Sequence, residues 1–251
     1  MKLVNYQEWS AERQSIYGTN TNTVDNKTYF FMNPSVLCDK THVVNNDITV
    51  YFGRDMDGGG TSFAAEMHNV VRYLYPTRVF NNCFEWCSGP GYIGFEMLSR
   101  GICNNLFLGE IYKPCVTAIE KTMANLPDKY KNKVSVSHLH CLDVLPGNLE
   151  FDLVVSNPPH WNTVGETMAS KIKFLDRTSA DSDWAIHKNF FINIKKHLAP
   201  NGVILLLESS YASGPDSFRE FIEAAELTIT KVFWKEGAND FYYLEIQHKD
   251  H

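Results

Sequence analysis

Short apolar runs alternate with amphipathic segments from about residue 79 to the end of the chain. Short apolar runs bounded by turn residues predict strands, whereas apolar positions three and four residues apart predict helices. The pattern predicts strands at residues 79–86, 105–110, 133–140, 151–156, 203–208, 228–235 and 242–248, and helices at residues 92–100, 112–125, 183–198 and 215–225. This alternation is typical of an α/β fold, in which helices cover both faces of a mainly parallel sheet.

The last two predicted strands differ from the others in how they are connected. Only a few residues, including Gly237 and Asp240, separate them, which is too short for a helical crossover. We therefore expect a doubly wound, mainly parallel sheet of seven strands that ends in an antiparallel hairpin. The standard dinucleotide-binding sheet needs no such hairpin.

The beginning of the chain is less regular. Residues 9–17 fit a helix, and residues 28–32 and 48–52 fit strands. We expect a small N-terminal extension at residues 1–47, followed by one main domain at residues 48–251.

Composition and charge narrow the class of protein. The chain has 251 residues, 44% of them hydrophobic and 21% charged, which is ordinary for a folded globular protein. It contains neither a bilayer-spanning apolar stretch nor a secretion signal, so we expect a cytoplasmic protein without a membrane partner. A net charge of −6 argues against a protein that grips long duplex nucleic acid by itself. The six cysteines are scattered, so reduced thiols are expected.

A glycine-rich loop follows the first strand of the main domain. Gly89, Gly91 and Gly94 are spaced G-x-G-x-x-G between the strand at 79–86 and the helix at 92–100. Glycines here let a ligand approach the backbone, and the N–H groups that begin the helix favour its negative or polar groups. The pattern alone is also compatible with an ordinary tight turn.

Three acidic residues make the loop more informative. Glu85, Glu110 and Asp143 each stand at or just after the end of a predicted strand, where an open α/β sheet binds its ligand. Glu110 suits ribose hydroxyls in a nicotinamide enzyme or a methyltransferase alike. Glu85 and Asp143 favour S-adenosylmethionine, because one carboxylate would face its ammonium group and the other its adenine amine, whereas Glu85 would repel a pyrophosphate.

The fourth predicted strand, at residues 151–156, is followed directly by Asn157, Pro158, Pro159 and His160. The prolines fix the backbone, so the side-chain carbonyl of Asn157 and the backbone carbonyl of Pro158 form a rigid pair of acceptors. Such a pair suits a planar NH2 group, whose nitrogen it can orient toward an electrophilic methyl.

With these motifs the chain resembles the class I S-adenosylmethionine-dependent methyltransferases. It looks most like their N-P-P group, which includes ribosomal RNA guanine-N2, tRNA adenine-N6 and release-factor glutamine methyltransferases. The resemblance extends over about residues 48–248, since residues 51–61 are similar to the turn that precedes the family's main domain. It implies the cofactor S-adenosyl-L-methionine.

The resemblance implies specific roles for individual residues. Gly89, Gly91 and Gly94 line the methionine and ribose of the cofactor, Glu85 lies near its amino-acid part, Glu110 holds the ribose and Asp143 the adenine. Asn157 and Pro158 accept from the target amine. The cofactor-binding set implied by the resemblance also includes Cys87, Ile111, Val144 and Asn157. The catalytic set also includes Pro159 and His160.

The implied activity is methylation of a planar amino or amide nitrogen of RNA or protein. His160 departs from the family, which has tyrosine or phenylalanine there to stack on the target, so either His160 or the adjacent Trp161 takes that place. A small-molecule N- or O-methyltransferase and a cofactor-binding scaffold subunit remain open as alternatives.

Other features carry weaker expectations. His138, His140 and Cys141 have metal-ligand side chains without a second ligand pair, so no metal is expected. The insert at residues 161–182 carries Lys171, Lys173 and Arg177. These side chains could contact phosphates or an acidic partner, or the insert could simply be a solvated loop. We expect residues 57–60 to form a lid over the cofactor. We expect Trp184 and His187 to pack in the hydrophobic core.

Overall fold

A computed structural model describes residues 3–5, 38, 40–53, 56, 60–139, 142, 145–162, 180–235 and 238–249. The predictions for residues 9–17, 28–32, 57–59, 140–141, 143–144 and 163–179 lie outside this part of the chain. Seven strands of the main sheet match the expected ones, with bounds β4 (Phe80–Trp86), β5 (Cys103–Glu110), β6 (Val134–His138), β7 (Phe151–Ser156), β8 (Leu198–Ser209), β9 (Leu227–Lys235) and β10 (Ala238–His248).

The order of the strands reverses beside β4. The sheet runs β1-β9-β10-β8-β7-β4-β5-β6, and β4 to β8 pair in parallel. The expected terminal hairpin is confirmed, since β10 lies between β8 and β9 and is antiparallel to both. β4 therefore has β5 on one side and β7 on the other, which places a crevice at the carboxyl ends of β4 and β7.

One strand of the sheet was not expected. β1 (Leu3–Asn5) pairs with the edge strand β9, so the sheet has eight strands rather than the seven predicted. Three residues are too few to show a strand period in the sequence. A separate hairpin of β2 (Lys40–Val44) and β3 (Ile48–Phe52) spans the position at which the main domain is expected to begin. The division at residues 47 and 48 stays a prediction.

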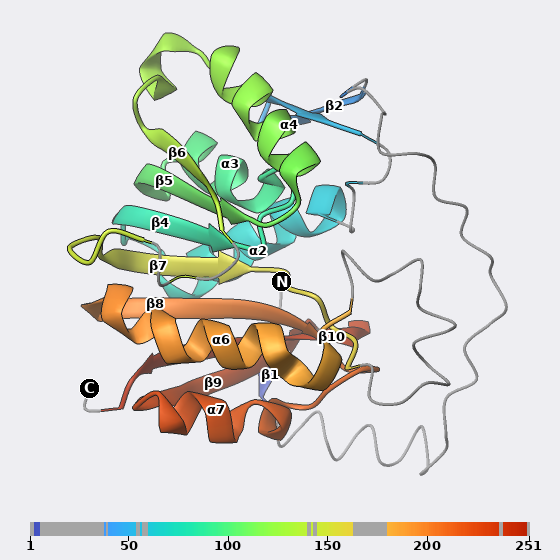
Figure 1. The fold of residues 1–251 in the computed structure, drawn as a ribbon, viewed down its shortest axis with the longest axis vertical. Coiled ribbons are helices and arrows are strands. Elements are labelled where there is room, and N and C mark those ends of the chain that lie inside the picture. The colour runs from blue at the N-terminus through green and yellow to red at the C-terminus, as the bar shows by residue number, and fades with distance from the viewer. Residues whose placement is uncertain are drawn as a thin grey trace, which may run out of the picture.

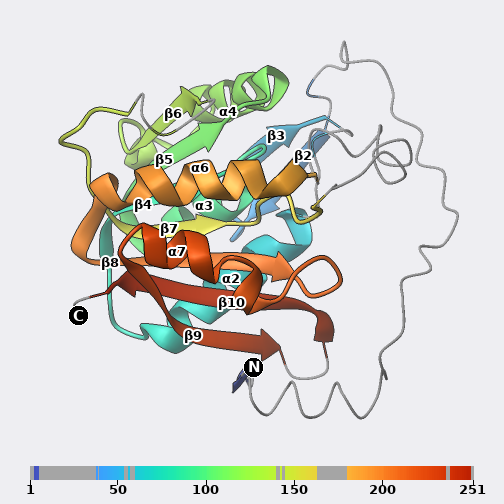
Figure 2. The ribbon, with the colours of Figure 1, turned by 60° about the horizontal axis from the view of Figure 1, so that its bottom comes forward.

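Helices pack on both faces of the sheet (Figure 1). They are α2 (Gly60–Leu74), α3 (Tyr92–Ser99), α4 (Lys113–Ala124), α6 (Ala185–Ile194) and α7 (Arg219–Ala224). The last two correspond to the longer helices expected at 183–198 and 215–225. Short 3-10 turns stand at both ends of α6 and before α7, and residue 198 already belongs to β8. Figure 2 shows α6 and α7 together in front of the sheet.

Alternation along the strands creates two hydrophobic cores. Leu153 and Val155 of β7 pack with α2, α3 and α4 on one face, while Val154, between them, packs with α6 and α7 on the other. Because successive side chains of a strand point to opposite faces, a strand covered on both faces is apolar throughout. This double burial holds the carboxyl ends of β4, β5 and β7 in a fixed arrangement.

Candidate functional site

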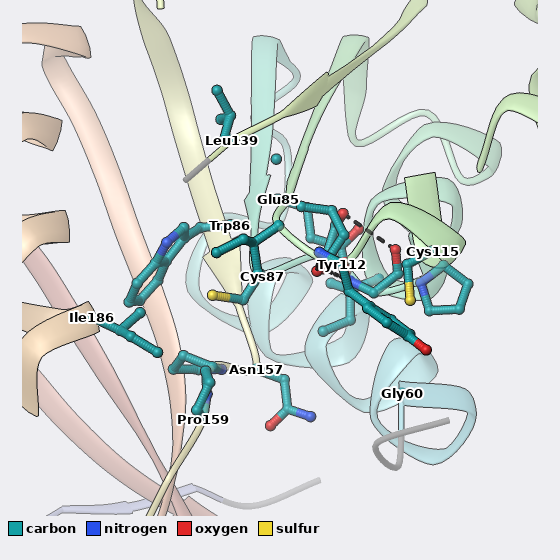
Figure 3. Close-up of a pocket in the computed structure, with 18 of the residues that line it drawn as sticks. Gly60, Glu85, Trp86, Cys87, Tyr112, Cys115, Leu139, Asn157, Pro159 and Ile186 are labelled. Carbon is teal, nitrogen blue, oxygen red and sulfur yellow. Dashed lines mark hydrogen bonds between the residues drawn. The ribbon is translucent and has the colours of Figure 1, made fainter. Parts of the chain in front are cut away.

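A cavity of about 570 Å³ opens at the carboxyl ends of β4, β5 and β7. In Figure 3, Trp86, Ile186 and Pro159 lie on one side of Cys87, and Tyr112 and Cys115 lie on the other. The volume falls within the range of small-molecule and cofactor sites. The cavity thus occupies the crevice at which the strand order reverses.

The glycine loop forms the turn from β4 into α3. Gly89 and Gly91 have φ values of +52° and +88°, and Cys87 shares the left-handed region at +53°. A Cβ added to Gly91 would lie 2.9 Å from the ring of Phe95, so only glycine suits its space as well as its backbone. Gly89 and Cys87 line the cavity, whereas Gly91 and Gly94 shape the turn beneath it.

Glu85 reaches the cavity from the end of β4 and is almost fully buried. Its Oε2 accepts a hydrogen bond of 2.8 Å from the backbone N–H of Gly94, in the first turn of α3. Burial raises the pKa of the Glu85 carboxyl to about 8, against the lowering effect of the Gly94 and Ile93 N–H groups and with a smaller contribution from Glu110. The carboxyl therefore supports the loop, and a cationic ligand beside it would favour its ionised form.

Glu110 closes β5 and holds the loop from the opposite side. Its Oε2 accepts from the N–H of Gly89 at 2.6 Å, and its Oε1 accepts from the N–H of Tyr112 at 2.7 Å. Burial raises the pKa of the Glu110 carboxyl above its ordinary value, while these N–H groups oppose the change. One carboxylate thus connects the loop after β4 to the start of α4.

The end of β7 places Asn157 on the cavity wall. Ser156, the last residue of the strand, donates from Oγ to the carbonyl of Trp86 at 2.5 Å and so ties β7 to β4. Asn157 Oδ1 lies 2.9 Å from Nε2 of His160, and Nδ1 of His160 lies 3.2 Å from Oε2 of Glu208. Figure 3 shows Asn157 beyond the end of β7, beside Pro159.

The structure brings most of the predicted site residues together. Those that line the cavity are Glu85, Cys87, Gly89, Glu110, Ile111, Asn157, Pro158, Pro159 and His160. Asp143 and Val144 lie outside the described residues. His160 and Trp161, the two alternatives for the stacking aromatic, both line the cavity.

Several further residues of the site are not predicted by the sequence. Trp86, Tyr112 and Ile186 line the cavity, and Glu208 contacts His160 from β8. Tyr112 follows a predicted acidic strand end, a signal that could have found it. Ile186 and Glu208 come from elements far along the chain, and nothing in their spacing indicates the contact.

Within the described part of the chain, no three His, Cys, Asp or Glu side chains are grouped as a metal ion would require. His138 uses its Nε2 on the backbone carbonyl of Ile111, 2.7 Å away. None of the helices among the described residues is long and apolar enough to cross a membrane.

Comparison with known proteins gives matches among solved structures. No protein-family model and no curated protein matches the chain. The glycopeptide N-methyltransferase MtfA is 16% identical with a TM-score of 0.55, and the match covers 75% of this chain and 90% of that one. The same enzyme complexed with S-adenosyl-L-methionine matches at 14% identity and a TM-score of 0.55, over 74% of this chain and 93% of the other.

A further match is an S-adenosylmethionine-dependent methyltransferase from Clostridium acetobutylicum. It is 10% identical with a TM-score of 0.51, and the match covers 76% of this chain and 93% of that chain. At such identities the likeness concerns the fold. Together with the strand order, it shows that this chain has the Rossmann-like fold of the class I S-adenosylmethionine-dependent methyltransferases.

Proposed function

We propose that the protein is an S-adenosylmethionine-dependent N-methyltransferase that acts on a planar amino or amide nitrogen of RNA or protein. The observation that carries the proposal is that one cavity contains both Asn157–Pro158 and the glycine loop with its two buried carboxyls. A site for a methyl donor and a site for an NH2 group are therefore adjacent. Positioning the two reactants is itself a large part of catalysis for a displacement of this kind.

The residues of the cavity fit the proposed cofactor. Gly89 has no wall atom closer than 3.8 Å to where a Cβ would lie, so its backbone borders open space. Glu85 would receive the ammonium group and Glu110 the ribose hydroxyls, while Ile111, Leu139 and Leu142 offer apolar surface to the adenine ring. Asp143 as the partner of the adenine amine stays a prediction. When bound, S-adenosylmethionine supplies a methyl group on a positively charged sulfur, which is the electrophile.

At the acceptor end, Asn157 Oδ1 and the Pro158 carbonyl would accept from the N–H groups of the target. They orient its nitrogen and favour the positive charge that develops there as the new bond forms. The surrounding wall includes Trp86, Pro159 and Ile186, which suit a planar or apolar group. Either a nucleobase amine or a glutamine amide meets these requirements.

A second candidate is methylation of a small molecule at nitrogen or oxygen. The acidic balance of the chain, with a net charge of −6, favours it, as does a histidine at position 160 in place of tyrosine or phenylalanine. RNA, glutamine-containing protein and small amines can be compared directly by transfer of labelled methyl from S-adenosylmethionine. Methyl-N products from RNA or protein support the first candidate, and products only from small molecules support the second.

The Asn157→Ala variant tests the role of the acceptor pair. We expect turnover to fall by about a hundredfold or more, the usual effect of losing an oriented transition-state contact, with folding and S-adenosylhomocysteine affinity nearly unchanged. Asn157→Asp keeps an acceptor oxygen and should retain part of the activity. Methyl transfer and calorimetric binding, measured on the same preparations, separate the two effects.

Asn105→Ala is the matched control. Asn105 lies near the amino end of β5, where its side chain contacts Asn81 and Asn82 rather than the cavity. It should methylate at the wild-type rate. If Asn157→Ala also does so, the N-methyltransferase assignment is wrong, and an O-methylating or scaffold role takes its place.

A further inference from the structure

A chain of hydrogen bonds runs from the cavity wall into the core. Asn157 Oδ1 and His160 Nε2 are 2.9 Å apart, and His160 Nδ1 is 3.2 Å from Glu208 Oε2. Glu208 Oε1 lies 3.0 Å from His187 Nε2, and His187 Nδ1 lies 2.5 Å from Asp181 Oδ2. Asn157 and His160 line the cavity, whereas Asp181, His187 and Glu208 are completely buried.

The inner end of this chain is rigidly held. The His187 ring stacks on Phe218, with centroids 4.6 Å apart, and meets the edges of Trp86 and Trp184 at 5.4 and 5.5 Å. Asp181 also accepts from the N–H of Ile186 at 2.8 Å, which anchors its carboxylate to the first turn of α6. The ring of His187 therefore has one orientation, with each nitrogen directed at a carboxylate.

The charges of the groups in this chain of hydrogen bonds favour the same orientation of the two imidazole rings. Burial alone would lower the pKa of His187, but Glu208 and Asp181 raise it to about 9, so the ring is positively charged at neutral pH. Burial would raise the pKa of Glu208, yet the charge of His187 and the hydrogen bonds from His160 and His187 bring it below its ordinary value. The anionic Glu208 accordingly accepts from Nδ1 of His160, and this contact turns Nε2 toward Asn157.

The prolines after Asn157 fix its backbone but do not themselves decide which way round its side-chain amide lies. A rotated amide would present NH2 in place of its carbonyl to an incoming amine, and a donor facing a donor repels. Asn157 therefore needs a partner that selects one orientation of the amide. Both partners of the His160 ring are oxygen atoms, so this arrangement uses both ring nitrogens as donors, Nδ1 to Glu208 and Nε2 to Asn157. The Nε2 donor selects the amide orientation with Oδ1 toward the imidazole, which leaves a second lone pair of Oδ1 for the acceptor amine.

We infer that Glu208 is a positioning residue of the acceptor site, which acts through His160 to hold the Asn157 amide in its productive orientation, with His187 and Asp181 holding Glu208 from behind. This inference rests on the role of Asn157 in the proposed function. It gives His160 a role different from that of the usual stacking aromatic, because hydrogen bonds at both nitrogens orient its ring.

The Glu208→Gln variant tests this chain of hydrogen bonds with the least change in side-chain shape. It removes the negative charge that orients His160 while keeping a side chain of the same size. Glu245→Gln is the matched control, because Glu245 is also completely buried in the sheet but bonds to Tyr75, Thr230 and Lys231. Both proteins are labelled with ¹⁵N at asparagine side chains, and the Asn157 resonance is identified by its loss in Asn157→Ala.

We expect the Asn157 side-chain NH2 resonance to shift in Glu208→Gln and to stay in place in Glu245→Gln. In methyl transfer, kcat should fall about tenfold or more in Glu208→Gln, while its S-adenosylhomocysteine affinity stays within about twofold of wild type. A resonance and a kcat that both match wild type overturn the inference and leave the proposed function intact.

His160→Phe interrupts the chain of hydrogen bonds independently, at the cavity wall. It therefore tests the inference even if Glu208→Gln does not fold. It should shift the Asn157 resonance while the His187 ring signals remain as in wild type. An unmoved Asn157 resonance in His160→Phe contradicts the inference. The Asn157 resonance reports on the chain of hydrogen bonds without any methyl acceptor. Failure of the proposed function would therefore appear separately, as an absence of methyl transfer in the wild-type protein.

Discussion

At the scale of single residues, buried carboxyl groups dominate the site. Glu85 and Glu110 each accept backbone N–H groups of the glycine loop or of the helix that follows their own strand. Burying a carboxylate is costly unless hydrogen bonds or a cation compensate it. A cationic ligand that pairs with these carboxyls in their ionised form would offset that cost.

Glu85 gives a prediction for stability against pH. Its pKa is about 8 in the folded protein and near the ordinary 4.5 when unfolded, so between these values the folded state binds a proton that the unfolded state does not. The free energy of unfolding should then fall as pH rises from about 5 to 8, by roughly 1.4 kcal/mol for each unit of pKa difference. Glu85→Gln should remove this part of the decline, as measured by urea unfolding across the pH range.

Glu96→Gln is the control for that measurement. Glu96 is equally buried nearby, in α3, but is paired with Arg100 at 2.5 Å. It should keep the wild-type decline between pH 5 and 8. Parallel curves for wild type and Glu85→Gln would show that Glu85 does not hold its proton in the folded state.

At the scale of elements, the turn from β4 into α3 shows why this part of the site was predictable. Its glycines are required locally, and their spacing is visible in the sequence. The connection of α6 to the site could not be predicted from the sequence, because Asp181 and His187 reach Glu208 only after β8 is placed beside β7. Predicting His187 as a packing residue captured its burial and missed the hydrogen bonds it makes.

The turn also gives a prediction with its own control. Gly91→Ala should destabilise the protein more than Gly101→Ala, although both glycines have positive φ values, +88° and +63°. The left-handed backbone costs an alanine about 1–2 kcal/mol at either position. A Cβ at Gly91 would additionally meet Phe95 and Leu108, whereas a Cβ at Gly101 meets nothing within 4 Å.

Urea unfolding of the two glycine variants measures the difference. Gly91→Ala should also weaken S-adenosylhomocysteine binding, because moving Phe95 or Leu108 displaces the loop above them. Equal losses of stability in the two variants would contradict the close packing of the turn. Unchanged binding in a destabilised Gly91→Ala would separate the turn from the proposed cofactor site.

At the scale of the whole molecule, the topology of the sheet decides where the site lies. Reversal of the strand order beside β4 and burial of β7 on both faces bring strand ends from residues 85, 110 and 156 to one cavity. The sequence predicts these strands and their helices because their hydrophobic periods are clear. It does not predict β1, which is only three residues long and is defined by its pairing with β9.

The most direct test of the account is a calorimetric titration of the wild-type protein with S-adenosylhomocysteine, beside one with NAD. The cavity with Glu85 and Glu110 should bind S-adenosylhomocysteine with a Kd in the micromolar range, about −8 kcal/mol. NAD should give no comparable heat, because it has no ammonium group to pair with Glu85 and its pyrophosphate opposes ionisation of the buried carboxyls. Binding of NAD without binding of S-adenosylhomocysteine would contradict the account.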